Sequence, residues 1–417
     1  MSLPGLFSAF DDALLVEAVR TPWIDYRGAL AGVSPTDLGI FAGRSLLRRS
    51  ALDPASIDSV LAGNMAQASF DAYMLPRHIG LYCGVPQQVP ALGVQRICGT
   101  GLELLRQGAE QIQRGQAEGV LCVAAESMSR NPIASYSHRS GFTLGQPVEF
   151  KDFLWEALFD PAVGLSMMQT AENLARRHGL RREEVDAYAL RSFQRALQAQ
   201  ADGWFAGEIE EVREQTFEQA GLAPRHLKLS GRNARADRDS HLRETSIEAL
   251  ARLGAIYPEG VQTAGNSCAV VDGAAAALLM SASAAAGRPT LAHLRAAAVV
   301  GVDPAVMGIG PAPAIRLLLQ GSGLRLEQIG HFEINEAQAA QVLAVQRELE
   351  LDDQRLNPHG GAIALGHPLA ATGLRLAHTV ARQMAASGQR YGIASACIGG
   401  GQGMAVLLEN PQPTACN

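Results

Sequence analysis

Two cysteines and a histidine lie in glycine-rich segments of a kind that suits acyl transfer through a thioester. Cys98 begins a Cys-Gly-Thr-Gly turn that leads into a helix, whereas Cys397 lies between an apolar strand and three glycines. His367 lies in a Gly-His-Pro turn. A thiol becomes a strong nucleophile when a base takes its proton, and an imidazole on a rigid turn can be that base. These residue types therefore predict nucleophilic catalysis by a cysteine.

The local settings of these residues suggest separate tasks. At the start of a helix, unpaired backbone amides should lower the pKa of the Cys98 thiol. Pro368 fits the first turn of a helix and would hold His367 at that helix start. The glycines after Cys397 leave backbone amides free to face a developing oxyanion, and Asn335, after a strand, can hold a water or a carbonyl oxygen. A structural role is the alternative for each residue taken alone, because buried cysteines are common.

The two ends of the chain repeat each other at one constant spacing. The spacing from Thr100 to Thr372 aligns two Thr-Gly-Leu segments, and it also pairs the strand ending at Ala125 with the strand ending at Cys397. A spacing kept over so many positions indicates a duplicated fold rather than a chance match between alanine-rich helices. The duplication predicts that the two helices beginning at these threonines face each other, and that the second thiol has no sulfur counterpart.

The order of elements predicts an α/β protein. In the first half we expect strands at residues 13–19, 59–62 and 120–125, with a helix at 36–49. Alternating strands and helices imply mostly parallel sheets that are covered by helices.

Residues 131–260 differ in composition from the rest of the chain, and we expect them to form an insertion over the core. They carry most of the aromatic residues and two long charged helices, at 161–178 and 182–201. The alanine-rich run at 273–286 is too short to span a membrane, and we expect a buried helix there.

Composition narrows the class of protein. The chain has 417 residues, of which 47% are hydrophobic and 18% charged, which predicts a globular protein with a large core. A net charge of −6 favours neither nucleic acid nor an anionic membrane as a partner. Because no signal peptide is recognisable, we expect a cytoplasmic protein with free thiols. No CxxC motif accompanies the six cysteines, so we expect no metal site.

From near the N-terminus to about Glu409, the chain resembles the thiolases. Four blocks carry the resemblance, and a fifth, Thr-Ala-Gly-Asn-Ser at 263–267 followed by Asp-Gly-Ala-Ala-Ala, supports it. The four blocks are the segment around Cys98, Asn335-Glu336-Ala337, residues 357–368 and Cys397-Ile398-Gly399-Gly400-Gly401. The resemblance implies a five-layered αβαβα fold built from two similar halves. The N-terminal half would span 12–284, with a loop domain inserted at about 131–260, and the C-terminal half would span 288–411.

The resemblance also implies an enzyme. It would be an acetyl-CoA C-acyltransferase that cleaves 3-oxoacyl-CoA or condenses acetyl-CoA by a ping-pong mechanism, with coenzyme A as substrate and product and no tightly bound cofactor. Family members act in fatty acid metabolism and are commonly dimers or tetramers, so a homodimer or homotetramer is expected.

The resemblance assigns roles residue by residue. Cys98 would carry the acyl group, His367 would deprotonate it, and Cys397 would move the proton at the α-carbon. Asn335, through a water, and His367 would form one oxyanion hole, and the backbone amides of Cys98 and Gly399 the other. The residues matched to substrate contacts are Met167, Met307 and Cys268.

Three departures leave the acyl chain length and the pantetheine contacts open. Gln338 stands where an aromatic residue is usual, Cys268 replaces a serine that often contacts pantetheine, and Ser166 stands where acetoacetyl-specific members often have a histidine. These changes leave the expected catalytic residues in place.

Rival functions remain. A decarboxylating ketoacyl synthase of the same fold typically has a histidine where Asn335 stands and no cysteine at Cys397, and the sterol-carrier type of thiolase has a different block at Asn335. A catalytically inactive binding subunit would show a broken set of catalytic residues. A metal-binding protein is the most distant alternative.

Overall fold

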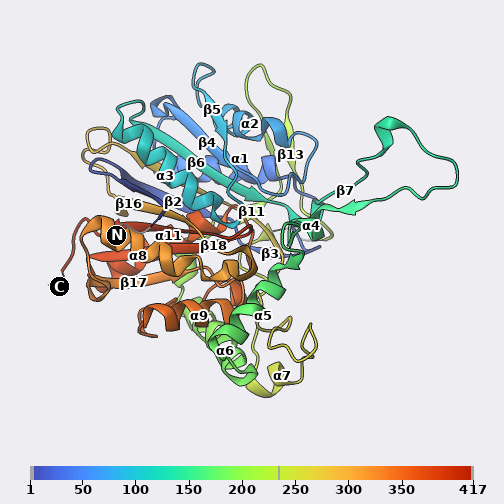
Figure 1. Ribbon diagram of the computed structural model, residues 1–417. Coiled ribbons are helices and arrows are strands. Elements are labelled where there is room, and N and C mark those ends of the chain that lie inside the picture. Colours follow the sequence, from blue (N-terminus) through green and yellow to red (C-terminus); the bar gives the residue numbers. More distant parts are fainter. Residues whose placement is uncertain (1–3, 233–234, 415–417) are drawn as a thin grey trace.

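The computed structural model describes residues 4–232 and 235–414, which form two α/β halves that pack face to face in five layers (Figure 1). Helices α1 (Pro35–Arg49) and α2 (Leu75–Tyr82) cover the outer side of the first sheet. Helices α3 (Thr100–Gln113) and α11 (Thr372–Ser387) form the middle layer. The outer side of the second half carries α8 (Pro311–Ser322) and α9 (Ala339–Leu349).

The main strands follow the order β17-β18-β19-β16-β2-β15-β6-β4-β5. The two halves meet where Leu14 and Leu15 of β2 pair with His293 and Ala292 of β16. The strands of the first half are β2 (Leu14–Arg20), β4 (Ser59–Gly63), β5 (Ala91–Gly93), β6 (Gly119–Glu126) and β15 (Val271–Met280). Those of the second half are β1 (Leu6–Ala9), β16 (Ala292–Gly301), β17 (Ile329–Ile334), β18 (Tyr391–Ile398) and β19 (Gln402–Glu409).

The expectation of mostly parallel sheets is wrong. Only β4 with β5, β4 with β6, and β17 with β18 are parallel among these main strands. Strand β15 is antiparallel to both of its long neighbours, and so is β19. The pairing of β19 with β18 has a local reason. A tight glycine turn joins these two strands, and a turn that short can connect only antiparallel strands.

The expected helix at 273–286 is also wrong, because β15 occupies Val271–Met280. All ten of its residues are buried. A short run of small apolar residues has no period that separates a buried helix from a buried strand. Its place between β2 and β6 decides the matter, since tertiary packing overrides the helix preference of alanine.

The insertion wraps around one end of the sheets. It contains α5 (Met167–His178) and α6 (Arg182–Ala201). Helix α6 confirms the prediction, whereas α5 begins six residues later than expected, since Ser166 caps its start. The shorter elements of the insertion, with β3 (Ile24–Asp25) and α10 (Ala362–Leu365), complete the fold. They are β7 (Ile133–Ala134), β8 (Lys151–Asp152), α4 (Phe153–Glu156), β9 (Phe159–Asp160), β10 (Leu165–Ser166), β11 (Val212–Arg213), β12 (Gln215–Phe217), β13 (Arg225–Leu227), β14 (Arg235–Ala236) and α7 (Ile247–Ala251).

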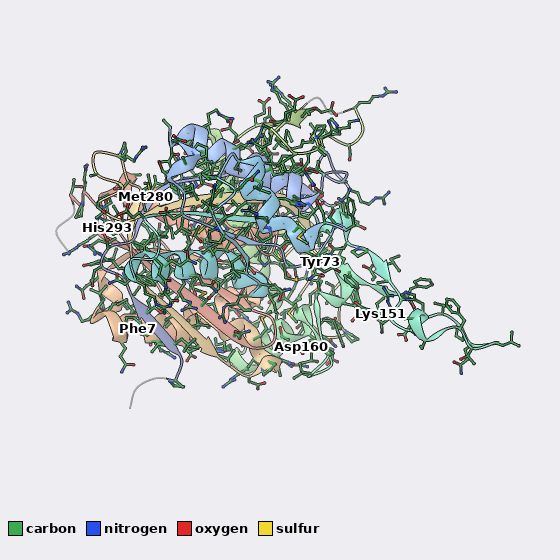
Figure 2. All side chains as sticks on the ribbon, turned by 90° about the horizontal axis from the view of Figure 1, so that it is seen from above. Phe7, Tyr73, Lys151, Asp160, Met280 and His293 are labelled. Atoms are coloured by element: carbon green, nitrogen blue, oxygen red, sulfur yellow. The ribbon has the colours of Figure 1, made fainter. Side chains whose placement is uncertain are left out.

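An arm between β7 and β8 extends away from the body, with Lys151 near its base (Figures 1 and 2). It exposes several large apolar side chains, among them Tyr136, Phe142 and Leu144. Of the helices in the described part of the chain, none combines the length and the apolar character needed to cross a membrane.

The repeated Thr-Gly-Leu segments explain how the middle helices meet. A Cβ atom added to Gly101 of α3 would lie 2.5 Å from the backbone nitrogen of Leu374 on α11. A Cβ atom on Gly373 would likewise collide with the backbone nitrogen of Leu102. The two glycines therefore let the helix starts touch backbone to backbone, which draws together the turns that precede them.

Replacing Gly101 by alanine should separate the two helix starts. We expect the free energy of unfolding to fall by about 1–3 kcal/mol, the usual cost of forcing an extra methyl group into a packed core. Urea denaturation checks the stability. Gly254→Ala is the matched control, because among the described residues no atom would lie within 4 Å of the new methyl group. Equal stability of the two variants would contradict this explanation of the helix contact.

Candidate active site

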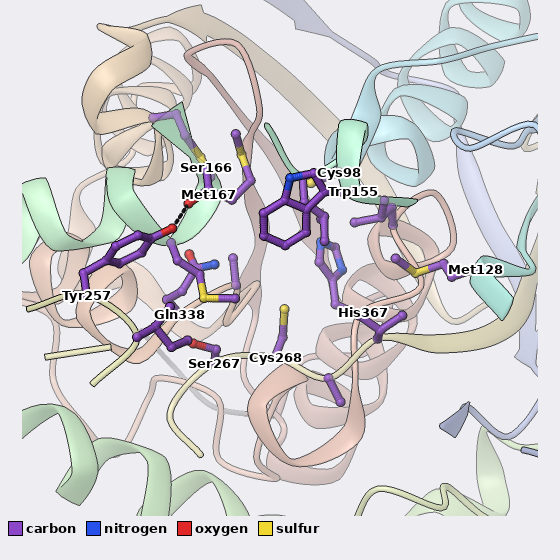
Figure 3. Close-up of a pocket in the computed structure, with 18 residues that line it drawn as sticks. Cys98, Met128, Trp155, Ser166, Met167, Tyr257, Ser267, Cys268, Gln338 and His367 are labelled. Atoms are coloured by element: carbon purple, nitrogen blue, oxygen red, sulfur yellow. Dashed lines mark hydrogen bonds between the residues drawn. The ribbon is translucent and has the colours of Figure 1, made fainter. Parts of the chain in front are cut away.

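A cavity of about 120 Å³ opens at the junction of the two halves. Cys98 and His367 both line it, from the turns that precede α3 and α11 (Figure 3). The three residues expected to contact substrate, Met167, Met307 and Cys268, line it as well. Most of the remaining lining is apolar, so an acyl chain can be buried here.

Cys98 lies in a single turn of 3₁₀ helix, Ile97–Gly99, immediately before α3. The preceding residue, Ile97, has a backbone φ of 45°, which a β-branched side chain rarely adopts. Strain of this kind persists only where surrounding contacts hold it, and it is frequent beside reactive residues. Here it shapes the turn that presents the Cys98 sulfur to the cavity.

The expectation of a lowered thiol pKa at Cys98 is wrong. Burial raises the pKa of Cys98 to about 11. Hydrogen bonds from the backbone amides of Gly399 and of Cys98 itself act in the opposite direction, but burial outweighs them. The resting residue is therefore a neutral thiol. The amides that act on its sulfur are the two that the sequence suggested for an oxyanion hole.

His367 is a neutral imidazole with a defined orientation. Its Nδ1 lies 2.6 Å from the Thr372 hydroxyl, which donates in turn to the Pro368 carbonyl at 3.3 Å. With the hydroxyl donating to that carbonyl, it accepts the proton of Nδ1, and the Asn335 Nδ2, which can only donate, faces the lone pair on Nε2. Burial, with the positive charge of Arg375, lowers the pKa of His367 to about 3. The expected helix start at Pro368 is wrong, since α11 begins at Thr372 and His367 lies in the turn before it.

Replacing Thr372 by valine should slow the reaction of Cys98 with acetyl-CoA by about tenfold, the usual effect of losing one orienting hydrogen bond. The reason is that His367 would no longer be held in the tautomer with a free Nε2. Quenched-flow mass spectrometry of the acetylated protein measures the rate. Thr170→Val is the control, because the buried Thr170 hydroxyl bonds only a carbonyl within its own helix. A rate unchanged in Thr372→Val would show that the hydroxyl does not set the tautomer.

Asn335 follows β17, and its Nδ2 lies 3.3 Å from Nε2 of His367. The neighbouring Glu336 holds this segment in place. Its carboxylate accepts hydrogen bonds from Tyr188 at 3.0 Å and from Asn357 at 3.0 Å. The Asn-Glu-Ala block thus holds the Asn335 amide donor next to the His367 imidazole.

Cys397 is the last residue but one of β18 and is fully buried. It packs against Met307 and Ala337, with Met167 beside them. Burial and the neighbouring Cys98 and Cys268 thiols raise its pKa well above the ordinary value, so it is a neutral thiol at rest. Cys397 itself is not among the residues lining the cavity, and neither are Asn335 or Gly399.

Asn335, Gly399 and Cys397 do not line the cavity, but each of them contacts a residue that does. Asn335 reaches it through His367, Gly399 through the Cys98 sulfur, and Cys397 through its methionine neighbours. The structure therefore brings all the expected catalytic residues together.

Some lining residues were not found from the sequence. Trp155 comes from the four-residue helix α4 and Tyr257 from an irregular segment, and the local pattern of neither predicts a cavity. Ser267 lies in the 263–267 block of the resemblance, which assigns it no role. Thr372 could have been found from the sequence, because it is the first residue of the repeated Thr-Gly-Leu segment. Its repeat partner Thr100 has a similar role, since its hydroxyl donates to the Ile97 carbonyl at 2.7 Å in the turn before α3.

The described residues contain neither a disulfide nor a group of side chains that could hold a metal ion. The five cysteines within 4–232 and 235–414 are free thiols, and Cys416 lies outside the described residues. No group of three His, Cys, Asp or Glu side chains in that part of the chain could hold a metal ion.

Comparisons with known proteins show the family to which the chain is similar. The thiolase N-terminal domain matches residues 13–283, and the thiolase C-terminal domain matches residues 288–410. The human mitochondrial 3-ketoacyl-CoA thiolase is 40% identical over 400 residues, which are 95% of this chain and 98% of that protein. A β-ketoadipyl-CoA thiolase of Acinetobacter baylyi is 40% identical over 408 residues, 95% of this chain and 99% of that protein.

A solved structure extends the similarity to three dimensions. The crystal structure of the human mitochondrial 3-ketoacyl-CoA thiolase superposes with a TM-score of 0.91 at 40% sequence identity, covering 98% of this chain and all of that one. Both halves of the fold are thus those of one family of acyltransferases. The chain belongs to the thiolase family.

Proposed function

We propose that this acyltransferase transfers acyl groups between coenzyme A and the Cys98 sulfur, and so interconverts a 3-oxoacyl-CoA with acetyl-CoA and a shortened acyl-CoA. The observation that carries the proposal is the neutral pair of Cys98 and His367 in one cavity, with the amides of Cys98 and Gly399 directed at the sulfur.

In cleavage, His367 Nε2 takes the proton of the Cys98 thiol as the sulfur attacks the 3-oxo carbon. The resulting oxyanion is stabilised by preorganised hydrogen-bond donors, which usually contribute more to such catalysis than any other effect. The bond between C2 and C3 then breaks and leaves an acyl-Cys98 thioester and the enolate of acetyl-CoA. Cys397 protonates the enolate carbon, and its raised pKa supports this role because it keeps the proton available.

The second half-reaction restores the enzyme. After acetyl-CoA leaves, the thiol of free coenzyme A gives a proton to the Cys397 thiolate and attacks the thioester. The acyl group passes to coenzyme A, and Cys98 leaves as a thiolate that recovers its proton from His367. Coenzyme A is therefore a substrate and product rather than a resident cofactor. A crystal structure of the human mitochondrial relative in complex with CoA supports this assignment.

The two oxygen sites receive different donors. Asn335 Nδ2 and the protonated Nε2 of His367 converge within 3.3 Å and suit one oxygen, with a water between it and Asn335. The amides of Cys98 and Gly399 suit the oxygen of the thioester held on the Cys98 sulfur.

The rival functions are not favoured. A decarboxylating synthase of this fold and an inactive binding subunit both require that the catalytic set be altered, whereas Cys98, Asn335, His367 and Cys397 are all present. The relatives that cover nearly the whole chain are named as thiolases or as an acetyl-CoA acetyltransferase, the latter from Pseudomonas aeruginosa.

Chains longer than four carbons should be substrates. Ser166 is small, and most of the residues that line the cavity are apolar. Thiolysis rates over a series of 3-oxoacyl-CoA lengths, starting at acetoacetyl-CoA, check this. Activity confined to acetoacetyl-CoA would contradict the proposed acyl pocket and would restrict the enzyme to acetyl transfer.

A homodimer or homotetramer is the proposed assembly. Strand β5 ends the sheet order of the described strands, and its Leu92 is half exposed beside the exposed Phe70 and Tyr73. An exposed sheet edge with large apolar residues is a typical association surface. Light scattering in solution measures the assembly, and a monomer at micromolar concentration would contradict it.

A further inference from the structure

A buried ion pair joins the strand that precedes Asn335 to the helix that follows His367. Arg375 Nη1 donates to Glu333 Oε2 at 2.8 Å, and neither side chain is more than 1% exposed. Glu333 lies on β17 and Arg375 on α11, and these two elements pack against each other. The mechanism of acyl transfer uses neither residue, so their burial needs another explanation.

The ion pair lies on the same faces of the two elements as the catalytic groups. Glu333 is two residues before Asn335, and the strand ladder continues to the backbone nitrogen of Asn335. Residues two apart in a strand point to the same face. Arg375 is three residues after Thr372, and residues three apart in a helix share a face. Because Thr372 also holds His367 Nδ1 at 2.6 Å, the ion pair is linked to the catalytic groups along both elements.

These contacts form a closed ring across β17 and α11. On one side of the ring Asn335 Nδ2 lies 3.3 Å from His367 Nε2, and on the other side lies the ion pair. A shift of α11 along β17 would therefore change both distances together. Hydrogen bonds weaken steeply when their length and angle change, so the ion pair resists such a shift.

The first half of the molecule shows that the packing does not require a charge at this strand position. The repeat aligns Glu333 with Leu61 of β4. The two residues occupy the same register, since Leu61 pairs with Cys122 in the parallel ladder of β4 and β6, and Glu333 pairs with Ala394 in that of β17 and β18. Leu61 is fully buried among apolar side chains.

The equivalent helix position also differs between the halves. Arg375 aligns with Glu103 of α3, which pairs with Arg96 and Arg106. Leu61 has no charge with which Glu103 could pair. Of these two equivalent pairs of positions, only the one in the half that carries the catalytic histidine therefore forms an ion pair between strand and helix.

Stability alone does not explain an ion pair in this place. Burying a carboxylate and a guanidinium sacrifices their hydration, and apolar side chains of similar volume often stabilise a fold as well or better. Arg375 shows this cost, because among the described residues its Nε and Nη2 have no hydrogen-bond partner. Burial raises the pKa of Glu333 to about 7, against the effect of Arg375, and either form of the carboxyl group can accept a hydrogen bond. A second such bond, from Gln383 Nε2 at 2.8 Å, fixes its orientation.

We propose that Glu333 and Arg375 are positioning residues, whose ion pair fixes α11 against β17 and thereby holds His367 and Asn335 at the separation that the reaction requires. A catalytic group must lie within about 0.5 Å of its productive place. A misplacement of about 1 Å can lower a rate by about 10²-fold. This inference rests on the proposed thiolase function and adds two residues to the same site.

A double variant tests the proposal on the full-length enzyme. Glu333→Leu combined with Arg375→Met gives β17 the apolar residue that β4 already has, so the urea midpoint should stay at or above that of the wild type. We expect kcat for thiolysis of acetoacetyl-CoA to fall by about tenfold or more. The Kd for coenzyme A, measured by calorimetry, should not change, because neither residue lines the cavity. Leu61→Met alters a buried side chain at the equivalent place in the first half and should keep kcat.

Glu333→Gln decides the question if the double variant does not fold. It keeps the shape of the side chain but removes its charge and one acceptor oxygen. We expect kcat to fall by about tenfold, the effect of one lost hydrogen bond, with the Kd for coenzyme A unchanged. All assays are made at a temperature where circular dichroism shows the variants folded. A wild-type kcat in either variant, or a fall in kcat only in step with the urea midpoint, would assign the ion pair to stability and overturn the proposal.

The outcomes separate this inference from the function on which it rests. Acetylation of Cys98 by acetyl-CoA is measured on the wild-type protein in parallel. If Cys98 is acetylated and the variants keep kcat, the positioning role is wrong and the thiolase function stands. If Cys98 is not acetylated, both are wrong.

Discussion

Replacing Cys98 by serine should lower kcat/KM for thiolysis by about 10⁴-fold or more, the scale seen when an enzyme loses its nucleophile. The hydroxyl occupies the same place beside the Cys98 and Gly399 amides, but it is a far weaker acid than a thiol. The imidazole of His367 therefore activates it far less effectively than it activates the Cys98 thiol. Loss of thioester absorbance during thiolysis of a 3-oxoacyl-CoA measures the rate.

Cys83→Ser is the matched control for that substitution. Cys83 is buried in the outer layer of the first half, where its sulfur lies 3.7 Å from the Ile40 carbonyl, and it does not line the cavity. It should keep activity, while its unfolding midpoint reports the general cost of exchanging a buried sulfur for oxygen. A Cys98→Ser enzyme within tenfold of the wild type would rule out Cys98 as the nucleophile.

Replacing Cys397 by alanine should separate the two halves of the reaction. Cys98 should still be acetylated by acetyl-CoA, because His367 and both amides remain. Formation and cleavage of the carbon–carbon bond should slow by about 10²–10⁴-fold, the usual contribution of a positioned acid or base. The physical reason is that the enolate carbon would have no proton donor in a site from which water is largely excluded.

The measurement compares acetyl incorporation, by mass spectrometry, with the steady-state rate of thiolysis in the same preparation. Cys397→Ser keeps more of the volume packed against Met307 and Ala337, so it controls for a cavity left by alanine. Normal turnover by either variant would show that the proton reaches the α-carbon by another route.

The duplication was the part of the fold most visible in the sequence. It is carried by local segments that occur twice, and the structure places α11 and β18 at the spacing that the sequence indicated from α3 and β6. Gly101 and Gly373 show why the signal was strong. Their lack of a side chain is required by a contact between the two copies, so both copies must keep it.

The errors arose where distant segments decide the outcome. The alanine-rich β15 resembles a helix in sequence because its strand form depends on β2 and β6, which come from other parts of the chain. The pKa of Cys98 was misjudged for a similar reason. Its helix-start position is local and favours the thiolate, whereas its burial is produced by residues from both halves and by the insertion.

The substrate side of the site was the least predictable. Gln338 was recognised as unusual, but the antiparallel bridge that sets Ser267 opposite it became apparent only in the structure. Trp155 lies in the four-residue helix α4 and Tyr257 in an irregular part of the insertion, and neither segment is long or periodic enough to predict a cavity.

The covalent intermediate provides the most direct test of the proposed mechanism. The wild-type protein is incubated with acetyl-CoA, quenched in acid, and examined by intact and peptide mass spectrometry, with Cys98→Ser treated in parallel. We predict one acetyl group per chain, located on Cys98 and absent from the variant. Acetylation at Cys268, Cys397 or another residue, or none at all, would contradict the mechanism.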